Sequence, residues 1–367
     1  MLQALDRHGI VPDVYAGTSI GALIGAAHAC GVSTGEMAER AERLRRRDLF
    51  RINHVGMALQ RMRSPSLYLE EPLRELVASV VPRRRLRDLP VRVLVNTVDL
   101  ERGTQLVWGL PGLDDAWLDE AVYASCALPG FFPPGVVAGR ACIDGGTVDN
   151  LPVDFAASLG VDAVIAVDVG SSQQGARLAA PAEGFAAIFM SAATTMMSAL
   201  QRGQLVRHRT PPLLLVRPAI ADVDWFAFGH AHEVIAAGRE AAEDALASLD
   251  RALAAPGGVF PRRLVRVGVD RARCVGCGLC VALAPDVMAL DADRCAYALE
   301  PEVSWSPADG DFVRHCPTNA IHVRDARQAA AAVTREMPAA SPNAPLAMTP
   351  PPVPRSPSSR GPRIKPR

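Results

Sequence analysis

Three cysteines spaced three residues apart are the feature that most limits how this chain can fold. They lie in the stretch RCVGCGLC at positions 274, 277 and 280, and a fourth cysteine, Cys316, is followed directly by proline. Three thiolates in so short a loop can converge on one inorganic group, while the fourth comes from a distant part of the chain. A zinc site more often uses two separated C-x2-C pairs. The spacing therefore favours a cubane [4Fe–4S] cluster over zinc.

The residues around these cysteines, about 262–325, resemble the single-cluster bacterial-type ferredoxins. In two-cluster relatives the first cysteine run continues after three residues into another Cys-Pro, but this chain has Ala284–Pro285 at that place. The resemblance implies a domain for electron transfer or redox sensing with one [4Fe–4S] cluster, a redox partner protein, and a spare thiol at Cys295. It implies as cluster ligands Cys274, Cys277, Cys280 and Cys316.

Composition and charge limit the partners and the compartment of the chain. The 367 residues carry no formal net charge, which argues against a general role in binding nucleic acid. No N-terminal stretch has the order of a signal peptide, and the longest apolar-rich segments, 20–30 and 185–200, are too short or too polar to span a bilayer. Five of the eight cysteines fall within 274–316, which in a cytosolic chain indicates metal binding more than disulfides. We therefore expect a soluble, cytoplasmic protein.

Two arginine-rich runs, 43–51 and 83–87, allow two interpretations. They could meet anionic lipid head groups and give the protein a peripheral membrane contact. They could equally form solvated helix faces balanced by nearby Asp and Glu, which is the more common situation.

The order of apolar runs predicts an α/β fold for most of the chain. Strand-like runs at 13–16, 91–98, 163–169 and 213–216 are separated by segments with helical spacing, which indicates a mostly parallel sheet. The later part of the chain has short strand-like flanks at 264–269 and 320–323 that could pair. We predict an α/β domain over 1–253, a linker over 254–261, a small α+β domain over 262–325, a helix-prone extension over 326–337 and a disordered Pro/Ser/Arg-rich tail over 338–367.

The motif G-T-S-I-G, from Gly17 to Gly21, makes Ser19 a candidate nucleophile. A short strand enters the motif and a helix leaves it, and the two glycines let the backbone turn sharply. The helix N-terminus adds a positive dipole, and the N–H of Ile20 could bind an oxyanion. The alternative is an ordinary serine at a helix N-cap after a strand.

A serine hydroxyl needs a base, and the sequence offers two kinds. None of the eight histidines follows an obvious strand end, although a triad with His208 or His230 stays open. Asp144 is the better candidate, because a short strand delivers it into a glycine pair in the stretch ACIDGGTVDNLP. An aspartate there could also be a structural turn residue.

Taken together, these stretches resemble the patatin-like phospholipases over roughly residues 1–250. The resemblance rests on GTSIGAL with Ser19, on SCALPGFFPP at 125–134, and on DGGTVDNLP with Asp144. It implies an α/β sandwich around a central sheet, Ser19 as nucleophile, Asp144 as its general base, and an acyl ester on the serine that water releases. Patatin-like proteins begin with a strand and a glycine-rich loop that supplies oxyanion donors, whereas this chain opens inside the following helix, at MLQALDRHGI. We expect a natural start upstream; a truncated, inactive hydrolase is the alternative.

Three functions remain open at this stage. The first is a lipid acyl hydrolase with a Ser–Asp dyad, acting on phospholipid, lysophospholipid or simple carboxylic esters and fused to a ferredoxin module. The second is an electron-transfer protein whose hydrolase domain is inactive and only binds lipid or a partner. The third is a histidine-dependent esterase, for which an Asp144→Asn variant would keep its activity.

Overall fold

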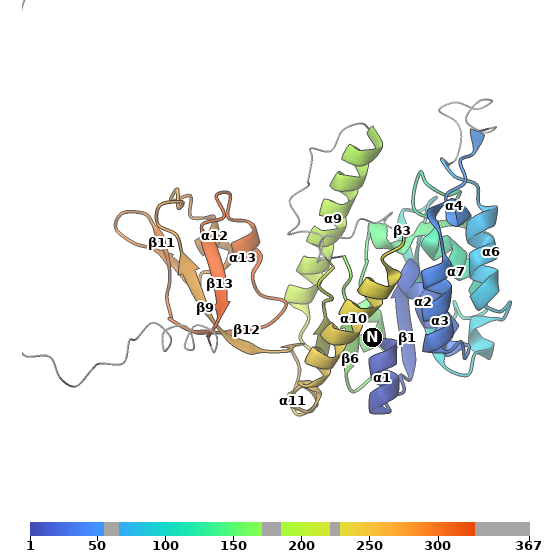
Figure 1. Ribbon diagram of the computed structural model, residues 1–367, viewed down its shortest axis with the longest axis horizontal. Helices are drawn as coiled ribbons and strands as arrows, with labels where there is room; N and C mark the ends of the chain where they lie inside the picture. The colour runs from blue at the N-terminus through green and yellow to red at the C-terminus, as the bar shows by residue number, and fades with distance from the viewer. Residues whose placement is uncertain (55–65, 171–184, 221–227, 327–367) are drawn as a thin grey trace, which may run out of the picture.

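The computed structural model describes residues 1–54, 66–170, 185–220 and 228–326 (Figure 1). The chain forms a larger α/β unit that extends to residue 260 and a smaller unit built from the residues after it. The predicted extension and tail lie outside the described residues, apart from Ala326.

The first sheet of the larger unit is built around one central strand. This strand, β2 (Arg92–Asp99), pairs in parallel with β1 (Val14–Thr18). Two shorter strands, β3 (Thr104–Trp108) and β5 (Arg140–Asp144), pair with β2 in antiparallel orientation. A third, β4 (Gly135–Val137), pairs antiparallel with β5. The predicted α/β class is confirmed, and the antiparallel pairs show that parallel pairing covers only part of this sheet.

The second sheet is entirely parallel, in the order β6-β7-β8. Its strands are β6 (Val164–Val167), β7 (Leu213–Val216) and β8 (Val259–Phe260). All four residues of β7 are buried, as expected for a strand covered on both faces. The strand β8 falls inside the segment 254–261 that the sequence predicts as a linker. Val259 and Phe260 are both buried, so this end of the segment belongs to the sheet of the larger unit.

Helices cover both sheets of the larger unit. Helices α2 and α7 contact the first sheet, and α10 packs on the second. The helices of the larger unit are α1 (Leu2–His8), α2 (Ile20–Ala29), α3 (Thr34–Arg43), α4 (Arg46–Leu49), α6 (Glu71–Val80), α7 (Leu118–Cys126), α8 (Val153–Ala157), α9 (Phe185–Arg207), α10 (Ala231–Leu246) and α11 (Leu249–Leu253). Two 3-10 turns, η2 (Leu86–Asp88) and η3 (Gly145–Thr147), complete it. No helix of the described residues is long and apolar enough to cross a membrane.

The smaller unit is an α+β domain with a three-stranded antiparallel sheet in the order β12-β9-β13. The central strand β9 (Arg263–Val269) pairs with β13 (Ile321–Asp325), which agrees with the predicted pairing of the two flanks. The third strand of this sheet is β12 (Val303–Trp305). The unit also contains a hairpin of β10 (Met288–Leu290) and β11 (Ala296–Ala298) and two short helices, α12 (Leu279–Leu283) and α13 (Asp311–Arg314).

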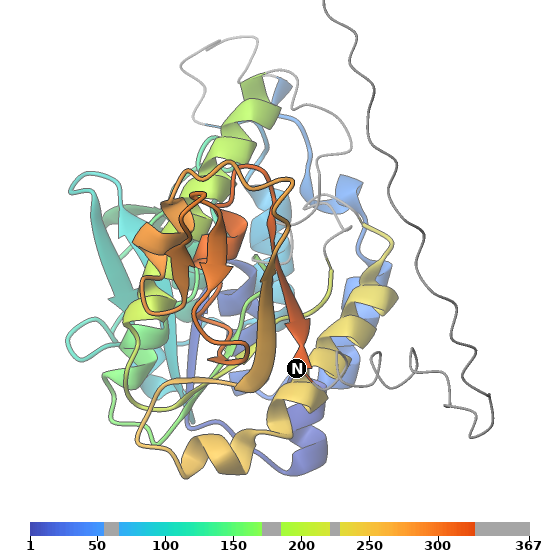
Figure 2. The same cartoon turned by 90° about the vertical axis from the view of Figure 1, so that its left-hand side faces the viewer.

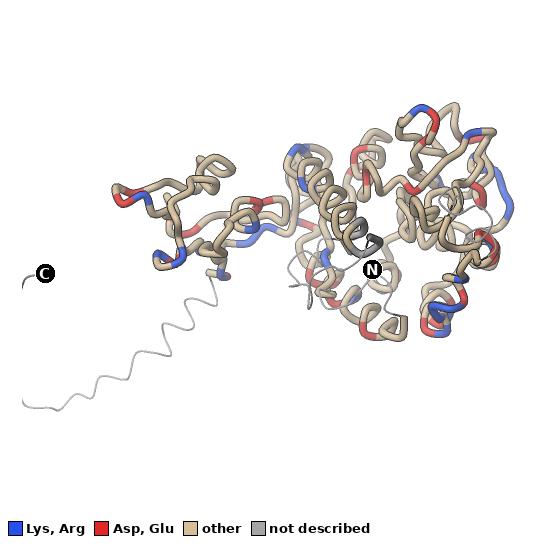
Figure 3. Tube along the Cα trace, turned by 90° about the horizontal axis from the view of Figure 1, so that it is seen from above, with Lys and Arg blue, Asp and Glu red and all other residues tan. Residues whose placement is uncertain are grey.

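The smaller unit lies beside the long helix α9 (Figures 1 and 2). Arg202 on α9 forms an ion pair with Asp311 on α13, with 3.1 Å between Nε and Oδ1. Arg217, just after β7, donates a hydrogen bond to the carbonyl oxygen of Pro307 at 2.5 Å. Basic and acidic residues alternate along the chain in both units (Figure 3). The two units therefore meet through polar contacts from α9 and from the segment that follows β7.

The ion pairs of the arginine-rich runs support their interpretation as solvated helix faces. Arg43 pairs with Glu39, and Arg83 pairs with both Asp119 and Glu120 at 2.8 and 2.9 Å. Since these arginines have acidic partners, the runs give no support to a membrane contact.

Candidate functional site

Strand register brings Ser19 and Asp144 together. Thr18, the last residue of β1, lies opposite Asn96 on β2, and Asp144, the last residue of β5, lies opposite Thr97. The strand β3 occupies the other edge of β2 at these positions, so β1 and β5 share one edge and end against neighbouring residues. Ser19 follows Thr18 directly, and hydrogen bonding from its side chain opposes the burial that raises the pKa of the Asp144 carboxyl. The two residues predicted as nucleophile and base therefore lie next to each other.

The backbone at Ser19 has the sharp turn that a nucleophile between strand and helix needs. Its φ is 55° and its ψ is −127°, a conformation rare for a residue with a side chain. A Cβ placed on Gly17 would lie 2.5 Å from the backbone nitrogen of Ala22, so only glycine fits there. A Cβ on Gly21 would meet nothing within 4 Å. Of the two motif glycines, Gly17 is thus the one that the turn requires.

A Gly17→Ala variant is expected to lose about 1–3 kcal/mol of unfolding free energy, because the new methyl group overlaps the start of α2. The matched control is Gly21→Ala, which adds the same methyl group to the helix in open space and should raise stability by about 0.5–1 kcal/mol. Urea unfolding of both variants measures this difference. Equal effects would contradict the steric role assigned to Gly17.

The environment of Asp144 suits a general base. The side chain is 3% exposed at the end of β5, and the N–H of Gly146 donates to its Oδ1 at 2.8 Å. Burial raises the pKa of Asp144 to about 6, against the opposing effect of the hydrogen bonds from Gly146 and Ser19. A carboxylate with a raised pKa accepts a proton near neutral pH more readily than an exposed aspartate does.

The histidines considered as alternative bases have other partners. Nε2 of His208 lies 2.7 Å from the carbonyl oxygen of Pro211, and its Nδ1 lies 3.9 Å from the carboxylate of Asp154. Nδ1 of His230 lies 3.0 Å from the carboxylate of Glu233. The contact between Ser19 and Asp144 therefore favours the aspartate as the base.

Phe131 and Phe132, which the patatin-like motif SCALPGFFPP contains, lie in the core. They are 9% and 6% exposed and pack against the ring of Tyr68. This placement gives them a structural role.

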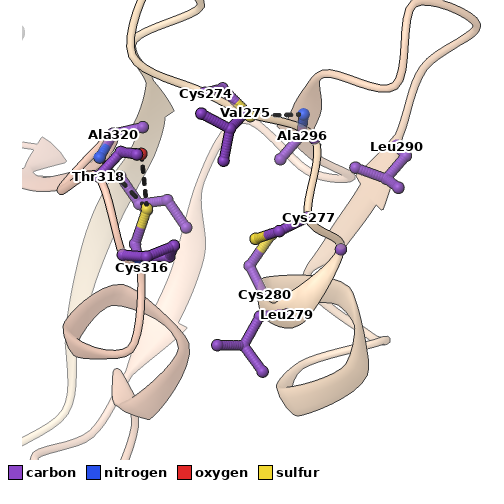
Figure 4. Close-up of a pocket in the computed structure, with 14 residues that line it drawn as sticks. Cys274, Val275, Cys277, Leu279, Cys280, Leu290, Ala296, Cys316, Thr318 and Ala320 are labelled. Atoms are coloured by element: carbon purple, nitrogen blue, oxygen red, sulfur yellow. Dashed lines mark hydrogen bonds between the residues drawn. The ribbon is translucent and has the colours of Figure 1, made fainter.

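The four predicted ligand cysteines line one pocket of the smaller unit (Figure 4). Cys274 and Cys277 come from the loop that leads into α12, Cys280 from the first turn of that helix, and Cys316 lies across the pocket, just after α13. Gly276 and Gly278 in the loop have positive φ values of 67° and 75°, which allow it to wrap around the pocket.

Backbone N–H groups point at two of these sulfurs. The N–H of Ala296 donates to Cys274 Sγ at 3.5 Å, and this bond lowers the pKa of the Cys274 thiol. The N–H of Ala320 donates to Cys316 Sγ at 3.3 Å, and this bond with others lowers the pKa of that thiol despite its partial burial. Such donors stabilise thiolates, which are the form that binds iron.

The arrangement of thiols suits a [4Fe–4S] cluster. The four cysteines line one shared space, and backbone N–H groups donate to two of their sulfurs. A cubane cluster fills such a space with several iron and sulfide atoms, so the residues fit this group.

Family comparisons agree with both sites. Residues 1–157 match the model of the patatin-like phospholipase family, and residues 267–323 match that of the 4Fe-4S single cluster domain. The chain carries a patatin-like phospholipase domain and a 4Fe-4S single cluster domain. The second match supports a [4Fe–4S] cluster as cofactor.

The patatin-like domain is similar to curated proteins over about half of the chain. An uncharacterized NTE family protein of Mycobacterium tuberculosis is 32% identical over 175 residues, 48% of this chain and 46% of that protein. Patatin-like phospholipase domain-containing protein 6 of Homo sapiens is 30% identical over 47% of this chain and 12% of its own length. Lysophospholipase NTE1 of Scheffersomyces stipitis is 28% identical over 47% of this chain and 11% of its own length. The chain thus spans less than half of the length of each of these relatives.

Two buried residues of the patatin-like domain support the dyad without having been predicted from the sequence. The hydroxyl of Ser125, on α7, accepts a hydrogen bond from the backbone N–H of Ser19 at 2.9 Å and donates to the carbonyl oxygen of Asn96 at 2.7 Å. The Asn96 side chain donates to the carbonyl oxygen of Asp149 at 2.7 Å and to the hydroxyl of Thr18 at 3.1 Å. Both residues are fully buried, so these bonds fix the end of β1.

Proposed function

We propose that the patatin-like domain is a lipid acyl hydrolase in which Ser19 is the nucleophile and Asp144 its general base. The observation that carries this proposal is the strand register that ends β1 and β5 against neighbouring residues of β2, which brings Ser19 to the buried carboxyl of Asp144. The matched family and the printed names of the relatives, which include a lysophospholipase, support lipid as the substrate class.

In the proposed reaction, Asp144 takes the proton of Ser19 while Oγ attacks the carbonyl carbon of the ester. The N–H of Ile20, the first in α2, can donate to the developing oxyanion, since the first N–H groups of a helix have no partner within it. Asp144 then gives its proton to the leaving alcohol, and the acyl group stays on Ser19. Water, deprotonated by the same carboxylate, attacks this ester and releases the fatty acid, after which Ser19 regains its proton.

Two apolar side chains close to the dyad in the sequence stay exposed and suit contact with an acyl chain. Ile20, next to Ser19 in the chain, is 55% exposed, and Val148, four residues after Asp144, is 39% exposed. Large apolar side chains that stay exposed close to reactive groups are suited to contact the hydrocarbon part of a substrate. This observation supports a lipid over a small polar ester.

The pH dependence of hydrolysis should follow the ionisation of Asp144. The base acts as a carboxylate, and its raised pKa of about 6 means that acidification protonates it. We therefore expect kcat/KM for a neutral ester to be constant above pH 7 and to fall about tenfold for each pH unit well below pH 6. A rate that stays constant from pH 7 down to pH 5 would contradict this assignment.

A comparison of two variants separates the dyad from a histidine-dependent esterase, because a histidine base would titrate in the same pH range. Hydrolysis of a short-chain chromogenic ester and of a lysophospholipid would be measured for Asp144→Asn and for His208→Ala. The dyad predicts that only Asp144→Asn loses activity. Retained activity in Asp144→Asn with loss in the histidine variant would overturn the proposal.

A version extended upstream in frame, measured in parallel, tests whether further oxyanion donors precede Met1.

For the second domain we propose electron transfer or redox sensing, with Cys274, Cys277, Cys280 and Cys316 as cluster ligands. A bound [4Fe–4S] cluster supplies one-electron transfer.

The contact between the domains favours sensing. Helix α9 carries Arg202, which pairs with Asp311 in the helix that precedes Cys316. Helix α9 also carries Met197, whose methyl group lies against Gly146 in the turn after Asp144. Hydrolysis rates of the oxidised and the dithionite-reduced protein would test sensing, which equal rates would contradict.

A further inference from the structure

A fifth cysteine of the cluster domain lies beside one of the proposed cluster ligands. Cys295 and Cys274 line the same surface depression, although 20 residues separate them in the chain. The N–H of Ala296, the next residue, donates to the same Cys274 sulfur at 3.5 Å. The start of β11 is therefore packed directly against Cys274.

The backbone around Cys295 holds this contact in place. The N–H of Cys295 donates to Oδ1 of Asp291 at 2.8 Å, and the N–H of Asp291 donates to the carbonyl oxygen of Cys295 at 2.9 Å. Asp291 in turn accepts a hydrogen bond from Arg271, three residues before Cys274, at 2.6 Å. These bonds tie the loop before β11 to the segment that carries Cys274.

The two cysteines lie at a surface depression that small molecules can enter. Cys295 is only 7% exposed, but together with Cys274 it lines a surface depression of about 420 Å³. The other residues that line the depression are Arg271, Val275, Gly276, Asp293 and Arg294. The four-cysteine pattern is complete without Cys295, so its thiol is available for another reaction.

We propose that Cys274 and Cys295 form a disulfide when Cys274 is not bound to iron and a peroxide is present. This proposal rests on Cys274 being a cluster ligand. One thiolate attacks the peroxide oxygen, so that its sulfur becomes a sulfenic acid and hydroxide leaves to form water. The second thiolate attacks this sulfur and releases a second water. In sum, two thiols and one hydrogen peroxide give one disulfide and two waters.

This disulfide would act as a redox lock on the cluster domain. It removes Cys274 from the ligand set, so a new cluster cannot be completed until a dithiol reductant opens the bond. The pair would thus make rebuilding of the cluster depend on reducing conditions and protect Cys274 from further oxidation.

Peptide mapping of the full chain, depleted of iron and treated with hydrogen peroxide, tests the disulfide itself. Trypsin cuts after Arg273, Arg294 and Arg314, which separates Cys274 from Cys295 and leaves Cys295 as the single cysteine of its peptide. We expect peptides 274–294 and 295–314 to be linked, with fragmentation that assigns the bond to Cys274, and the link to disappear on reduction. A disulfide between Cys277 and Cys280, with none at Cys295, would overturn the proposal.

Rebuilding of the cluster from iron and sulfide provides a second readout. After peroxide treatment, the unaltered protein should rebuild at least about tenfold less cluster without a dithiol than with one, and Cys295→Ser should lose this dependence. The control Cys30→Ser, which changes a half-buried thiol of the other domain, should behave like the unaltered protein. Equal dithiol dependence in Cys295→Ser would contradict the lock. If Cys274 were not a ligand, the disulfide would still form, but untreated Cys274→Ser would rebuild the cluster fully.

Discussion

Replacing Ser19 by alanine is expected to lower the rate of ester hydrolysis about a thousandfold or more, because the acyl group has no other oxygen to bind at this site. Folding should be unaffected, since the smaller side chain removes only the hydroxyl that contacts Asp144. The measurement is kcat/KM for a chromogenic ester and for a lysophospholipid.

The matched control for this variant is Ser158→Ala, which removes an exposed hydroxyl that bonds to the carbonyl oxygen of Phe155. The control should keep the full rate. Equal activity of Ser19→Ala and the unaltered protein would show that hydrolysis does not use this serine. If no form of the protein hydrolysed either ester, the patatin-like domain would be left with a binding role and the cluster domain would become the working part.

Replacing Cys316 by serine is expected to have the second largest effect, on cluster content. Cys316 is the one proposed ligand outside the segment from Cys274 to Cys280 that carries the other three, and no other sulfur of the pocket lies on its side (Figure 4). Iron and acid-labile sulfide per chain should fall at least about tenfold, and the domain should lose stability, because cluster binding is coupled to its folding. Cys274, Cys280 and Cys316 all lie in or against its hydrophobic core.

Cys30→Ser serves as the control for cluster content as well, since Cys30 ends helix α2 in the other domain. Iron content should be unchanged in this variant. A Cys316→Ser protein with full iron and sulfide content would remove Cys316 from the ligand set, and a loss of iron in Cys30→Ser would point to a general effect of thiol removal.

The sequence predicted the local parts of both sites well. The alternation of apolar runs located β1, β2, β6 and β7 to within a few residues, because buried strands are continuous apolar segments that are easily distinguished from amphipathic helices. The cysteine spacing indicated a pocket that three close thiols and one distant thiol line together.

The contact between Ser19 and Asp144 could not be derived from local pattern alone. It depends on the register by which β1 and β5 end against neighbouring residues of β2. That register is set by pairing across 78 residues from Thr18 to Asn96 and across 47 residues from Thr97 to Asp144. The patatin-like resemblance supplied what local pattern did not. The support from Ser125 and Asn96 was missed for the same reason, since both act through backbone groups that are distant in the sequence.

Short elements were the other omission. The strand β8 has only two residues and follows directly after a Pro-Gly-Gly turn, so the sequence signals of a linker dominated.

The role of Gly21 was assigned from the motif, whereas the space around its Cα shows that Gly17 alone is sterically required for the turn.

Covalent labelling of the nucleophile is the most direct test of the central claim. An organophosphorus ester that phosphorylates activated serines would be added to the full chain, and the tryptic peptide from His8 to Arg40, which contains Ser19 and Ser33, would be analysed by mass spectrometry. We expect one adduct on Ser19, loss of ester hydrolysis in proportion to labelling, and much slower labelling of Asp144→Asn. Ester hydrolysis that continues with Ser19 unlabelled, or an adduct that inactivates the protein at another residue, would contradict the account.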